Sequence, residues 1–500
     1  MSVAEQHPGV PPAPEPTSHE VNPWLVLVLV CLAQFMVILD ATIVNVALPS
    51  IQADLQFSAA DLQWVINSYT LVFGGFLLLG GRAADLVGRR KLFIAGVIVF
   101  SAASLLNGLS TSAEMLVAAR GLQGLGGALV SPAALSIITT TFAEGPERTK
   151  ALGVWGAIAA GGGAFGLLLG GILTETLSWE WIFFVNVPVG IVAALLAWRF
   201  IPESHAEQRP DSFDFAGAVS VTAGLIVLVY AIVQAEEYGW GSTRTIGLAA
   251  LSLALLAAFV LIERRSSAPL VRLGIFKVRS LLGANLVLLV VAGGLFANFF
   301  FSSIYVQEIL GYTPLEAGLA FLPVTVGIVA GSGLSQILVK KVGVRETTMG
   351  GMALAAIGLF LLSQAEVDST YVGTLLPGLM LMSIGMGLTF VPVTLIATTN
   401  VSDEDAGLAS GLFNTSQQIG GALGLAVLAT LAADKTASVL GGLGRPPTPP
   451  EQAAAIVEGF QVAFTGASIL MLVGIVLLAA LVRRRDVANV NPEQPVMPGA

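Results

Sequence analysis

The sequence predicts an all-α polytopic membrane protein, and its composition and segment lengths carry that prediction. Hydrophobic residues make up 55% of the 500 residues and charged residues only 11%, where a soluble domain has about 25% charged residues. The mean hydropathy is +0.84. Apolar segments long enough to cross a bilayer, about 20 residues each, recur along the whole chain. This composition excludes a soluble enzyme and a disordered chain.

The titratable residues exclude several further classes. A net charge of -9 argues against nucleic-acid binding. Cys31 is the single cysteine, so neither a disulfide framework nor a cysteine metal cluster is expected. His7, His19 and His205 lie outside the apolar segments and have no ligand spacing. No phosphate-binding G-x-x-x-x-G-K-[ST] motif occurs, so we expect no ATP, metal or other cofactor.

Fourteen segments have the length and apolar character of a membrane span. In chain order they are residues 24–48, 62–81, 91–110, 114–141, 150–174, 181–200, 213–234, 245–263, 281–305, 315–338, 348–365, 371–398, 406–431 and 458–482. The seventh and eighth decide between twelve and fourteen spans. Both have adequate apolar length, and Glu236, Glu237 and Gly239 supply a polar turn between them.

The basic residues test this count. With the N-terminus in the cytoplasm, nineteen of the 23 Lys and Arg residues fall in cytoplasmic segments, Arg120 falls within a span, and only Arg244, Lys435 and Arg445 fall outside. This positive-inside bias supports an even number of spans and two cytoplasmic termini. The tails at residues 1–23 and 483–500 are therefore expected in the cytoplasm.

Three polar stretches are expected to lack fixed structure. Residues 1–23 are rich in proline and contain no Lys or Arg, so they lack the basic start of a signal peptide. Residues 432–457, with a proline-rich run, and residues 486–500 are also interpreted as flexible or disordered.

Two charged residues remain inside spans. Asp40 lies in the first span and Arg120 in the fourth, each among apolar neighbours. A charge at this depth costs about 2.5–3.5 kcal/mol on insertion scales, and such residues usually face a partner or a cavity. The alternatives are a capping role for Asp40 and a side chain of Arg120 that extends to the outer surface.

The depths of these two charges are similar. Asp40 lies about 12 Å from the outer end of its span and Arg120 about 9 Å, at 1.5 Å per residue. Burial disfavours an ionised carboxylate and a nearby cation favours it. A buried Asp beside an Arg that can move away therefore has the properties that a proton-coupled carrier needs.

Glycine is abundant, with 56 residues. In the fifth span Gly162, Gly166 and Gly170 recur every fourth residue, followed by Gly171, and so form one face. Ordinary close packing of helices explains such a face, and so does a surface on which two bundles rock.

Five motifs, in order along the chain, resemble the major facilitator superfamily, and in particular its fourteen-span drug:proton antiporter branch. They are residues 39–49 (LDATIVNVALP), 81–90 (GRAADLVGRR), 116–124 (LVAARGLQG), 166–171 (GLLLGG) and 179–188 (WEWIFFVNVP). The resemblance covers nearly the whole chain. It implies the major facilitator fold and the export of drugs or other toxic compounds in exchange for protons.

The resemblance assigns roles to individual residues. It implies proton coupling by Asp40 and Arg120 and an antiporter motif in the glycine face. It also implies a gating motif made of Gly81, Asp85, Gly88, Arg89 and Arg90.

The chain departs from the family pattern at three positions. Ala83 stands where leucine is frequent, Leu86 where a basic residue is usual, and Leu167 where proline is usual in the antiporter motif.

The gating motif also has a direct physical interpretation. A carboxylate at a helix end can cap neighbouring helices and pair with an Arg, so Asp85 is expected to hold the cytoplasmic side closed. A purely topogenic cluster explains Arg89, Arg90 and Lys91, but it does not explain an acid.

A weak repeat predicts the domain plan. Residues 85–90 (DLVGRR) recur loosely as residues 341–345 (KVGVR). We therefore expect two six-helix bundles, residues 24–200 and 281–482, with two inserted transmembrane helices at residues 213–263.

A substrate cavity is expected between the bundles. Its candidate lining residues are polar or aromatic positions in spans four, nine and thirteen: Gln123, Asn298, Phe301, Tyr305, Asn414 and Gln418. Hydrogen bonding between helices is the alternative role for the amides among them.

The function expected from the sequence is proton-driven export of amphipathic or hydrophobic small molecules across a bacterial inner membrane. The protein then interacts with substrate, protons and lipid, and with neither ATP nor nucleic acid. A proton-coupled carrier of one metabolite, in either direction, remains an alternative. A structural or sensor protein with an inactive carrier fold is a third, which the charges of Asp40, Asp85 and Arg120 disfavour.

Overall fold

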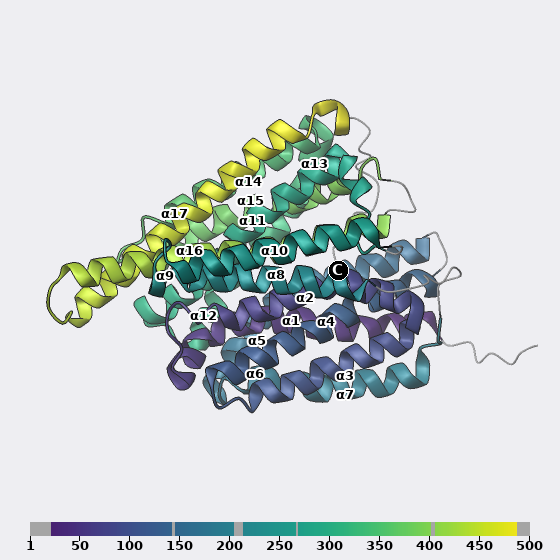
Figure 1. Ribbon diagram of the computed structural model, residues 1–500, viewed down its shortest axis with the longest axis horizontal. Coiled ribbons are helices and arrows are strands. Elements are labelled where there is room, and N and C mark those ends of the chain that lie inside the picture. Colours follow the sequence, from purple (N-terminus) through teal and green to yellow (C-terminus); the bar gives the residue numbers. More distant parts are fainter. Residues whose placement is uncertain (1–21, 143–145, 205–213, 267–268, 402–405, 488–500) are drawn as a thin grey trace, which may run out of the picture.

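The computed structural model describes residues 22–142, 146–204, 214–266, 269–401 and 406–487, and within these ranges the regular structure is entirely helical. The long helices of the first bundle and the inserted pair run in nearly one direction, and those of the second bundle, such as α17 (Pro449–Leu481), are inclined to them (Figure 1). We call the end that holds Pro23 and Leu481 the terminal end, and the opposite end, which holds Leu55 and Gly442, the distal end.

The first bundle is formed by α1 to α7. These helices are α1 (Pro23–Leu55), α2 (Trp64–Val87), α3 (Arg89–Gly108), α4 (Ala113–Thr141), α5 (Pro146–Thr176), α6 (Trp181–Phe184) and α7 (Asn186–Phe200). Helix α4 packs closely on α2 and α3, and α1 packs on α5, α4 and α7.

The second bundle is formed by α11 to α17. Its elements are α11 (Arg279–Ile304), the π-helix η2 (Tyr305–Ile309), α12 (Pro314–Ala320), α13 (Leu322–Val342), α14 (Val344–Leu362), the π-helix η3 (Tyr371–Leu375), α15 (Leu376–Thr398), α16 (Ala406–Gly442) and α17 (Pro449–Leu481). The 3₁₀ turns η1 (Leu273–Lys277) and η5 (Arg484–Val487) lie at its terminal end.

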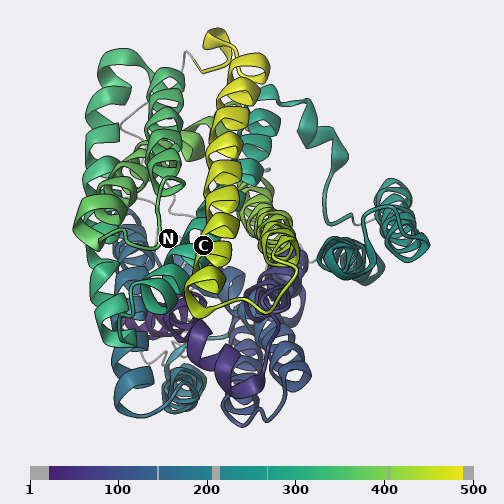
Figure 2. The ribbon, with the colours of Figure 1, turned by 90° about the vertical axis from the view of Figure 1, so that its left-hand side faces the viewer.

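The two inserted helices stand beside the bundles. Helices α8 (Phe215–Val233) and α10 (Thr243–Arg265) pack on each other, with the short α9 (Ala235–Tyr238) between them. Helix α8 also contacts α2 of the first bundle and α16 of the second. In Figure 2, which looks along the helices of this pair, the pair lies to one side of both bundles.

Twelve helices within the described residues are long and apolar enough to cross a membrane. They account for twelve of the fourteen expected spans, including the seventh and eighth. The other two expected spans coincide with α5 and with α14 (Val344–Leu362). Within α5, the segment Phe165–Thr176 is apolar but shorter than a membrane span. The count of fourteen therefore stays a prediction.

Two helices extend further than the sequence indicated. Helix α1 continues through Pro49 to Leu55, and α2 continues to Val87. Most of the expected loop between the second and third spans is therefore the last turns of α2, and Gly88 alone separates α2 from α3.

The prediction that residues 432–457 are flexible or disordered is wrong. Helix α16 runs on to Gly442 and α17 begins at Pro449, so most of this stretch is a helical hairpin at the distal end (Figure 1). The side chains of Thr448 and Glu451 form a capping box at the start of α17, and Arg445 pairs with Glu451 at 2.5 Å. Of the other two stretches expected to lack fixed structure, residues 1–21 and 488–500 lie outside the described residues, while Pro23 begins α1 and residues 486–487 belong to η5.

The weak sequence repeat corresponds to a repeated local structure. Gly88 joins α2 to α3 at φ 111°, and Gly343 joins α13 to α14 at φ 100°. L-residues with a side chain rarely adopt such φ values, so both turns favour glycine.

An arginine two residues after each of these glycines contacts the last helix of its own bundle. Arg90 donates to the carbonyl of Ile201, the C-cap of α7, at 3.2 Å. Arg345 donates to the carbonyl of Val482, the C-cap of α17, at 2.9 Å. The same turn and the same tie thus occur once in each half of the chain.

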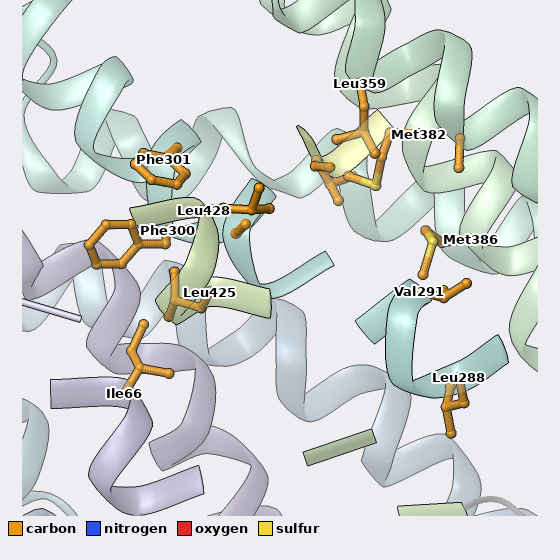
Figure 3. Packing of buried hydrophobic residues seen from close by; sticks show 14 of the residues in the cluster. Ile66, Leu288, Val291, Phe300, Phe301, Leu359, Met382, Met386, Leu425 and Leu428 are labelled. Carbon is orange, nitrogen blue, oxygen red and sulfur yellow. The ribbon is translucent and has the colours of Figure 1, made fainter. Parts of the chain in front are cut away.

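The buried apolar side chains form a core that crosses from one bundle to the other. One cluster contains Ile66 of α2 together with Phe300, Phe301, Leu425 and Leu428 of α11 and α16 (Figure 3). The outer faces of the helices carry large apolar residues such as Leu195, Trp198, Val326 and Val476, each more than 60% exposed. Lipid is the solvent for such faces.

Candidate functional site

The two charges that the sequence placed inside spans form an ion pair within the first bundle. Arg120 Nη1 on α4 lies 2.5 Å from Asp40 Oδ2 on α1. The side chain of Asp40 is 0% exposed and that of Arg120 is 1% exposed. Each charge therefore has its counter-charge in direct contact, which a buried ion requires.

Small residues let the helices of this bundle approach closely. A Cβ on Gly124 of α4 would meet the carbonyl of Tyr69 on α2, and a Cβ on Gly126 would lie 2.7 Å from the Cα of Phe100 on α3. Because these positions are glycine, α4 fits between α2 and α3, and Arg120 reaches the centre of the bundle.

Two amides complete the coordination of Asp40. Its Oδ1 accepts hydrogen bonds from Gln123 Nε2 at 2.7 Å and from Asn186 Nδ2 at 3.0 Å. Gln123 lies one turn after Arg120 on α4, and Asn186 begins α7. Both carboxylate oxygens are thus bound by donors from other helices, which favours the ionised form of a carboxylate.

The network continues into α3. Gln123 Oε1 accepts from Arg120 Nη1 and from Asn107 Nδ2, both at 2.7 Å. Ser104 Oγ accepts from Asn186 Nδ2 at 3.0 Å and donates to the carbonyl of Phe183 at 2.9 Å. The polar network therefore joins α1, α3, α4 and the α6–α7 corner.

Helix α2 supplies the remaining contacts of the guanidinium group. Arg120 Nε donates to the carbonyl of Val65 at 2.9 Å, and the guanidinium carbon lies 4.4 Å from the centre of the Tyr69 ring. The centre of the Phe183 ring lies 5.7 Å from the same carbon. A cation over an aromatic face is stabilised electrostatically, more strongly where water is excluded.

This arrangement can hold or release one proton at the Asp40 carboxylate. A neutral Asp40 would leave the Arg120 guanidinium buried with only neutral acceptors, Val65 O and Gln123 Oε1. An unpaired buried cation is costly, so protonation favours a rearrangement of Arg120 or of the helices that carry it.

Sequence reasoning missed several members of this network. Asn186 lies within the motif at residues 179–188, which was recognised but not connected to Asp40. Ser104 and Asn107 are isolated polar residues in the third span, and no pattern in the sequence distinguishes them.

A further acid lies in the second bundle. Because α11 continues as the π-helix η2, Glu308 belongs to the span that ends at Ile309. The sequence-based limit of 305 placed it outside the span.

The glycine face of α5 divides between two partners. Gly162, Gly166 and Gly170 face Ile38, Thr42 and the carbonyl of Ile43 on α1, where a Cβ would overlap. A Cβ on Gly171 instead would lie 2.9 Å from the Cα of Leu315 on α12, in the second bundle. The face thus contributes both to packing inside one bundle and to a contact between bundles.

The gating motif lies where α2, α3 and the end of α7 meet. The backbone N–H of Arg89 donates to the carbonyl of Ser204, and that of Arg90 donates to Glu203 Oε1 at 3.1 Å. Gly81 packs beside Pro132 of α4. The side chain of Asp85 lies outside the described part of the structure, so its predicted latch stays a prediction.

The six candidate cavity residues lie in three different places. Gln123 belongs to the Asp40 network. Gln418 of α16 lies against Gly74 of α2, at the contact between the bundles. Asn414, on the same helix, donates to the carbonyl of Ser410 one turn earlier.

The other three candidates are buried, Asn298 and Phe301 on α11 and Tyr305 at the start of η2. Phe301 and Tyr305 pack on Phe460 of α17, and the Tyr305 hydroxyl donates to the carbonyl of Glu366. Asn298 accepts a hydrogen bond from Ser302 at 3.4 Å. Their assignment to a substrate cavity stays a prediction, and in this conformation they lie within the second bundle.

The two bundles, the inserted pair and the buried ion pair define a multi-pass membrane transporter, a class with no catalytic chemistry of its own. The chain belongs to the Major Facilitator Superfamily, whose family model matches residues 30–425.

Relatives over most of the chain bear the names of antibiotic resistance and export proteins. The chain is 42% identical to the puromycin resistance protein of Streptomyces alboniger, over 92% of this chain and 90% of that protein. It is also 42% identical to the cephamycin export protein of Amycolatopsis lactamdurans, over 91% and 92%. A multidrug resistance protein of Mycobacterium tuberculosis is 36% identical over 82% and 76%.

Solved structures share the fold at low sequence identity. A bacterial homologue of the human lysosomal transporter Spinster superposes with a TM-score of 0.67 at 16% identity, over 94% of this chain and 99% of that chain. A peptide transporter of the POT family superposes with a TM-score of 0.66 at 16% identity, over 96% and 99%.

Proposed function

We propose that this protein exports amphipathic or hydrophobic small molecules in exchange for protons, by alternating access. The terminal end faces the cytoplasm of a bacterial cell, as the positive-inside bias of the sequence indicates. The relatives named for puromycin, cephamycin and multidrug resistance support toxic compounds as the exported class. Protons are the coupling ion, and no other cofactor takes part.

The observation that carries the proposal is the buried pair of Asp40 and Arg120. A pair that only held helices together could be replaced by apolar residues at little cost or even with a gain in stability. A carboxylate whose two oxygens are held by donors from two other helices, α4 and α7, is instead suited to change helix positions when it gains a proton.

The proposed cycle uses the same contacts. Proton entry from the outer side neutralises Asp40, and the freed Arg120 disfavours the conformation seen here. The bundles then change their relative tilt and the exposure of the substrate site. Proton release to the cytoplasm restores the ion pair, so each turn couples inward proton movement to outward substrate movement.

The test uses purified protein in proteoliposomes with an imposed pH gradient and an internal pH dye. The panel contains puromycin, lincomycin, a lipophilic cation and a neutral hydrophobic drug. Addition of a transported compound should collapse the gradient. Asp40→Asn should abolish that collapse, because Asn accepts hydrogen bonds but cannot carry the proton.

Asp54→Asn is the matched control. Asp54 is an exposed acid on the same helix, and its Oδ2 accepts from Trp179 Nε1, a bond that an Asn oxygen can replace. This variant should transport like the parent. Collapse that persists in Asp40→Asn would move the proton site elsewhere, with Glu308 as the next acid to replace.

A narrow exporter of one endogenous product is the second candidate. It is favoured by relatives named for a single compound, such as the cephamycin export protein and the tetracenomycin C resistance and export protein of Streptomyces glaucescens. If the protein is folded and no compound of the panel collapses the pH gradient, this candidate is favoured over broad export.

A further inference from the structure

The first helix carries a proline near its distal end. Pro49 lies inside α1, and a proline has no backbone N–H. The carbonyl of Asn45, four residues earlier, therefore lacks its helical donor. A buried carbonyl without a donor is unfavourable, so a partner from outside the helix is expected.

The partner comes from the other bundle. Ser303 Oγ on α11 donates to the carbonyl of Asn45 at 2.6 Å. Ser303 is fully buried, and Asn45 is 9% exposed. The serine thus satisfies the carbonyl that the proline has freed.

A second side chain extends this contact. Gln307 Nε2, one turn after Ser303, donates to the carbonyl of Val46 at 3.0 Å and lies 3.2 Å from Ser303 Oγ. Two neighbouring side chains of the second bundle therefore bind two successive carbonyls of the first. Because the acceptors are backbone atoms, the contact depends on the path of α1 and on Pro49, and not on the side chains of Asn45 and Val46.

Other contacts place this pair on the closed side of the molecule. The N–H of Leu315 on α12 donates to Glu175 Oε2 on α5 at 2.9 Å, also near the distal end. A Cβ on Gly318 of α12 would lie 2.7 Å from the carbonyl of Leu167 on α5. The distal end is thus closed by polar and close-packed contacts between the two bundles.

We propose that Ser303 and Gln307, with the carbonyl freed by Pro49, form the polar latch of the distal gate. The proposal rests on the alternating access of the proposed function. When the distal end opens, α1 and α11 separate and both bonds break. Each side-chain bond should then favour the closed state by about 2- to 10-fold.

The latch residues are positioning residues, since they touch backbone and not substrate. If these residues only stabilised the fold, replacing them would lower the melting temperature and leave the ratio of closed to open molecules unchanged. A latch instead changes the ratio of closed to open molecules, and this ratio can be measured as a distance distribution.

The test is pulsed electron spin resonance on the full chain in lipid nanodiscs, in a Cys31→Ser background. The distal pair of labels is placed at Ala59→Cys and Asp368→Cys, two exposed positions in the loops of the two bundles. A reporter pair for the terminal end is placed at Val87→Cys and Val342→Cys, which are also exposed.

Ser303→Ala with Gln307→Ala should raise the ratio of long to short distal distances by about 4- to 100-fold, the product of two bonds. The terminal distances should shorten correspondingly. Pro49→Ala should shift the ratio in the same direction, because its N–H competes with Ser303 for the Asn45 carbonyl.

Ser302→Ala is the matched control. Ser302 is the adjacent residue, it is buried, and its hydroxyl bonds Asn298 within its own helix. It should leave both distance distributions as in the parent. An unchanged distal distribution in the double variant, or an equal change in Ser302→Ala, would overturn the latch.

The same variants in the pH-gradient assay separate the two proposals. A distal shift in protein that exchanges no protons for any drug would contradict the proposed function and leave the latch standing. Proton-coupled export with an unchanged distal distribution would support the proposed function and overturn the latch.

Discussion

At the scale of single residues, we expect the charge balance around Asp40 to decide stability and, in the proposed exchange cycle, transport. Asp40 and Arg120 neutralise each other in a site without exposure. Removing one partner leaves the other charge buried, which costs about 3–5 kcal/mol, while removing both leaves only neutral groups to satisfy. A double-mutant cycle separates the interaction energy of the ion pair from the effect of each substitution alone.

The cycle consists of Asp40→Asn, Arg120→Gln and their combination. Each single variant should melt well below the parent in detergent, and the double variant should melt above both. All three should lose proton-coupled transport, because none has both the carboxylate and its cation. Additive losses of melting temperature would show that the ion pair has no coupling energy.

Asn186 offers a milder change at the same carboxylate. It donates to Asp40 Oδ1 at 3.0 Å and to Ser104 Oγ at the same distance. A donor bound to a carboxylate favours its charged form. Asn186→Leu should therefore let the carboxylate take up its proton at higher pH, and the pH of half-maximal exchange should rise.

The stability cost of Asn186→Leu should be about 1–3 kcal/mol, the range for a lost buried partner. Ser101→Ala is the control, since its hydroxyl donates to the carbonyl of Val97 within α3 and does not reach Asp40. A pH profile of Asn186→Leu that coincides with that of the parent would limit Asn186 to a structural role.

The sequence identified the two charges and their similar depth, but it could not show their contact or identify the neutral neighbours of the pair. Asp40 and Arg120 are conspicuous because charges are costly in a span. Asn107, Ser104 and Asn186 carry no charge, and polar neutral residues occur in many spans without a shared role. Which amide reaches which carboxylate depends on how the helices are rotated, and spacing along one helix does not fix that rotation.

At the scale of elements, the inserted pair depends on a few close contacts with the bundles. A Cβ on Gly75 of α2 would lie 2.9 Å from Thr222 Cβ on α8, so a side chain there must displace α8. On the other side, Thr430 of α16 donates to the carbonyl of Ile232, and Trp240 Nε1 donates to Asp434 Oδ2 at 3.2 Å. The pair thus contacts both bundles along the line where α2 meets α16.

Gly75→Val should weaken the contact between α8 and α2. Thermal stability should fall by about 1–3 kcal/mol from overpacking, and proteolysis of the linkers around the inserted pair should become faster. Gly247→Val is the control, because a Cβ at Gly247 of α10 meets nothing within 4 Å. Equal effects of the two substitutions would show that the pair is not held by this contact.

The distal hairpin shows where sequence reasoning used the wrong rule. Prolines at residues 446–450 indicated a flexible stretch, yet proline is favoured at the first positions of a helix. Thr448 followed three residues later by Glu451 is the sequence signature of a capping box, and the structure has that box. The helix start was therefore present in the sequence, and the proline content obscured it.

At the scale of the whole molecule, the two halves share one design. Gly88 and Arg90 in the first bundle correspond to Gly343 and Arg345 in the second, with the same φ region and the same tie to a final helix. Each bundle is thus closed on itself at the terminal end, while the distal contacts join α1 and α5 to α11 and α12. In the proposed cycle, such a molecule changes state by a tilt of two rigid bodies.

Crosslinking the distal end should therefore stop transport without unfolding the protein. Glu175→Cys and Leu315→Cys, in the Cys31→Ser background, place two thiols where the Glu175 side chain now reaches the Leu315 N–H. A short thiol-specific crosslinker should join the bundles and abolish drug-driven collapse of the pH gradient. A cleavable crosslinker should allow recovery on reduction, because the two bundles are then free to separate.

The control joins two positions within one bundle. Lys435→Cys with Glu458→Cys replaces an exposed ion pair between α16 and α17, whose atoms lie 2.9 Å apart. Because both helices belong to the second bundle, this crosslink should leave transport intact. Transport that survives the Glu175–Leu315 crosslink would mean that the distal contacts do not open during the cycle, and substrate would then have to leave by a route that does not separate α5 from α12.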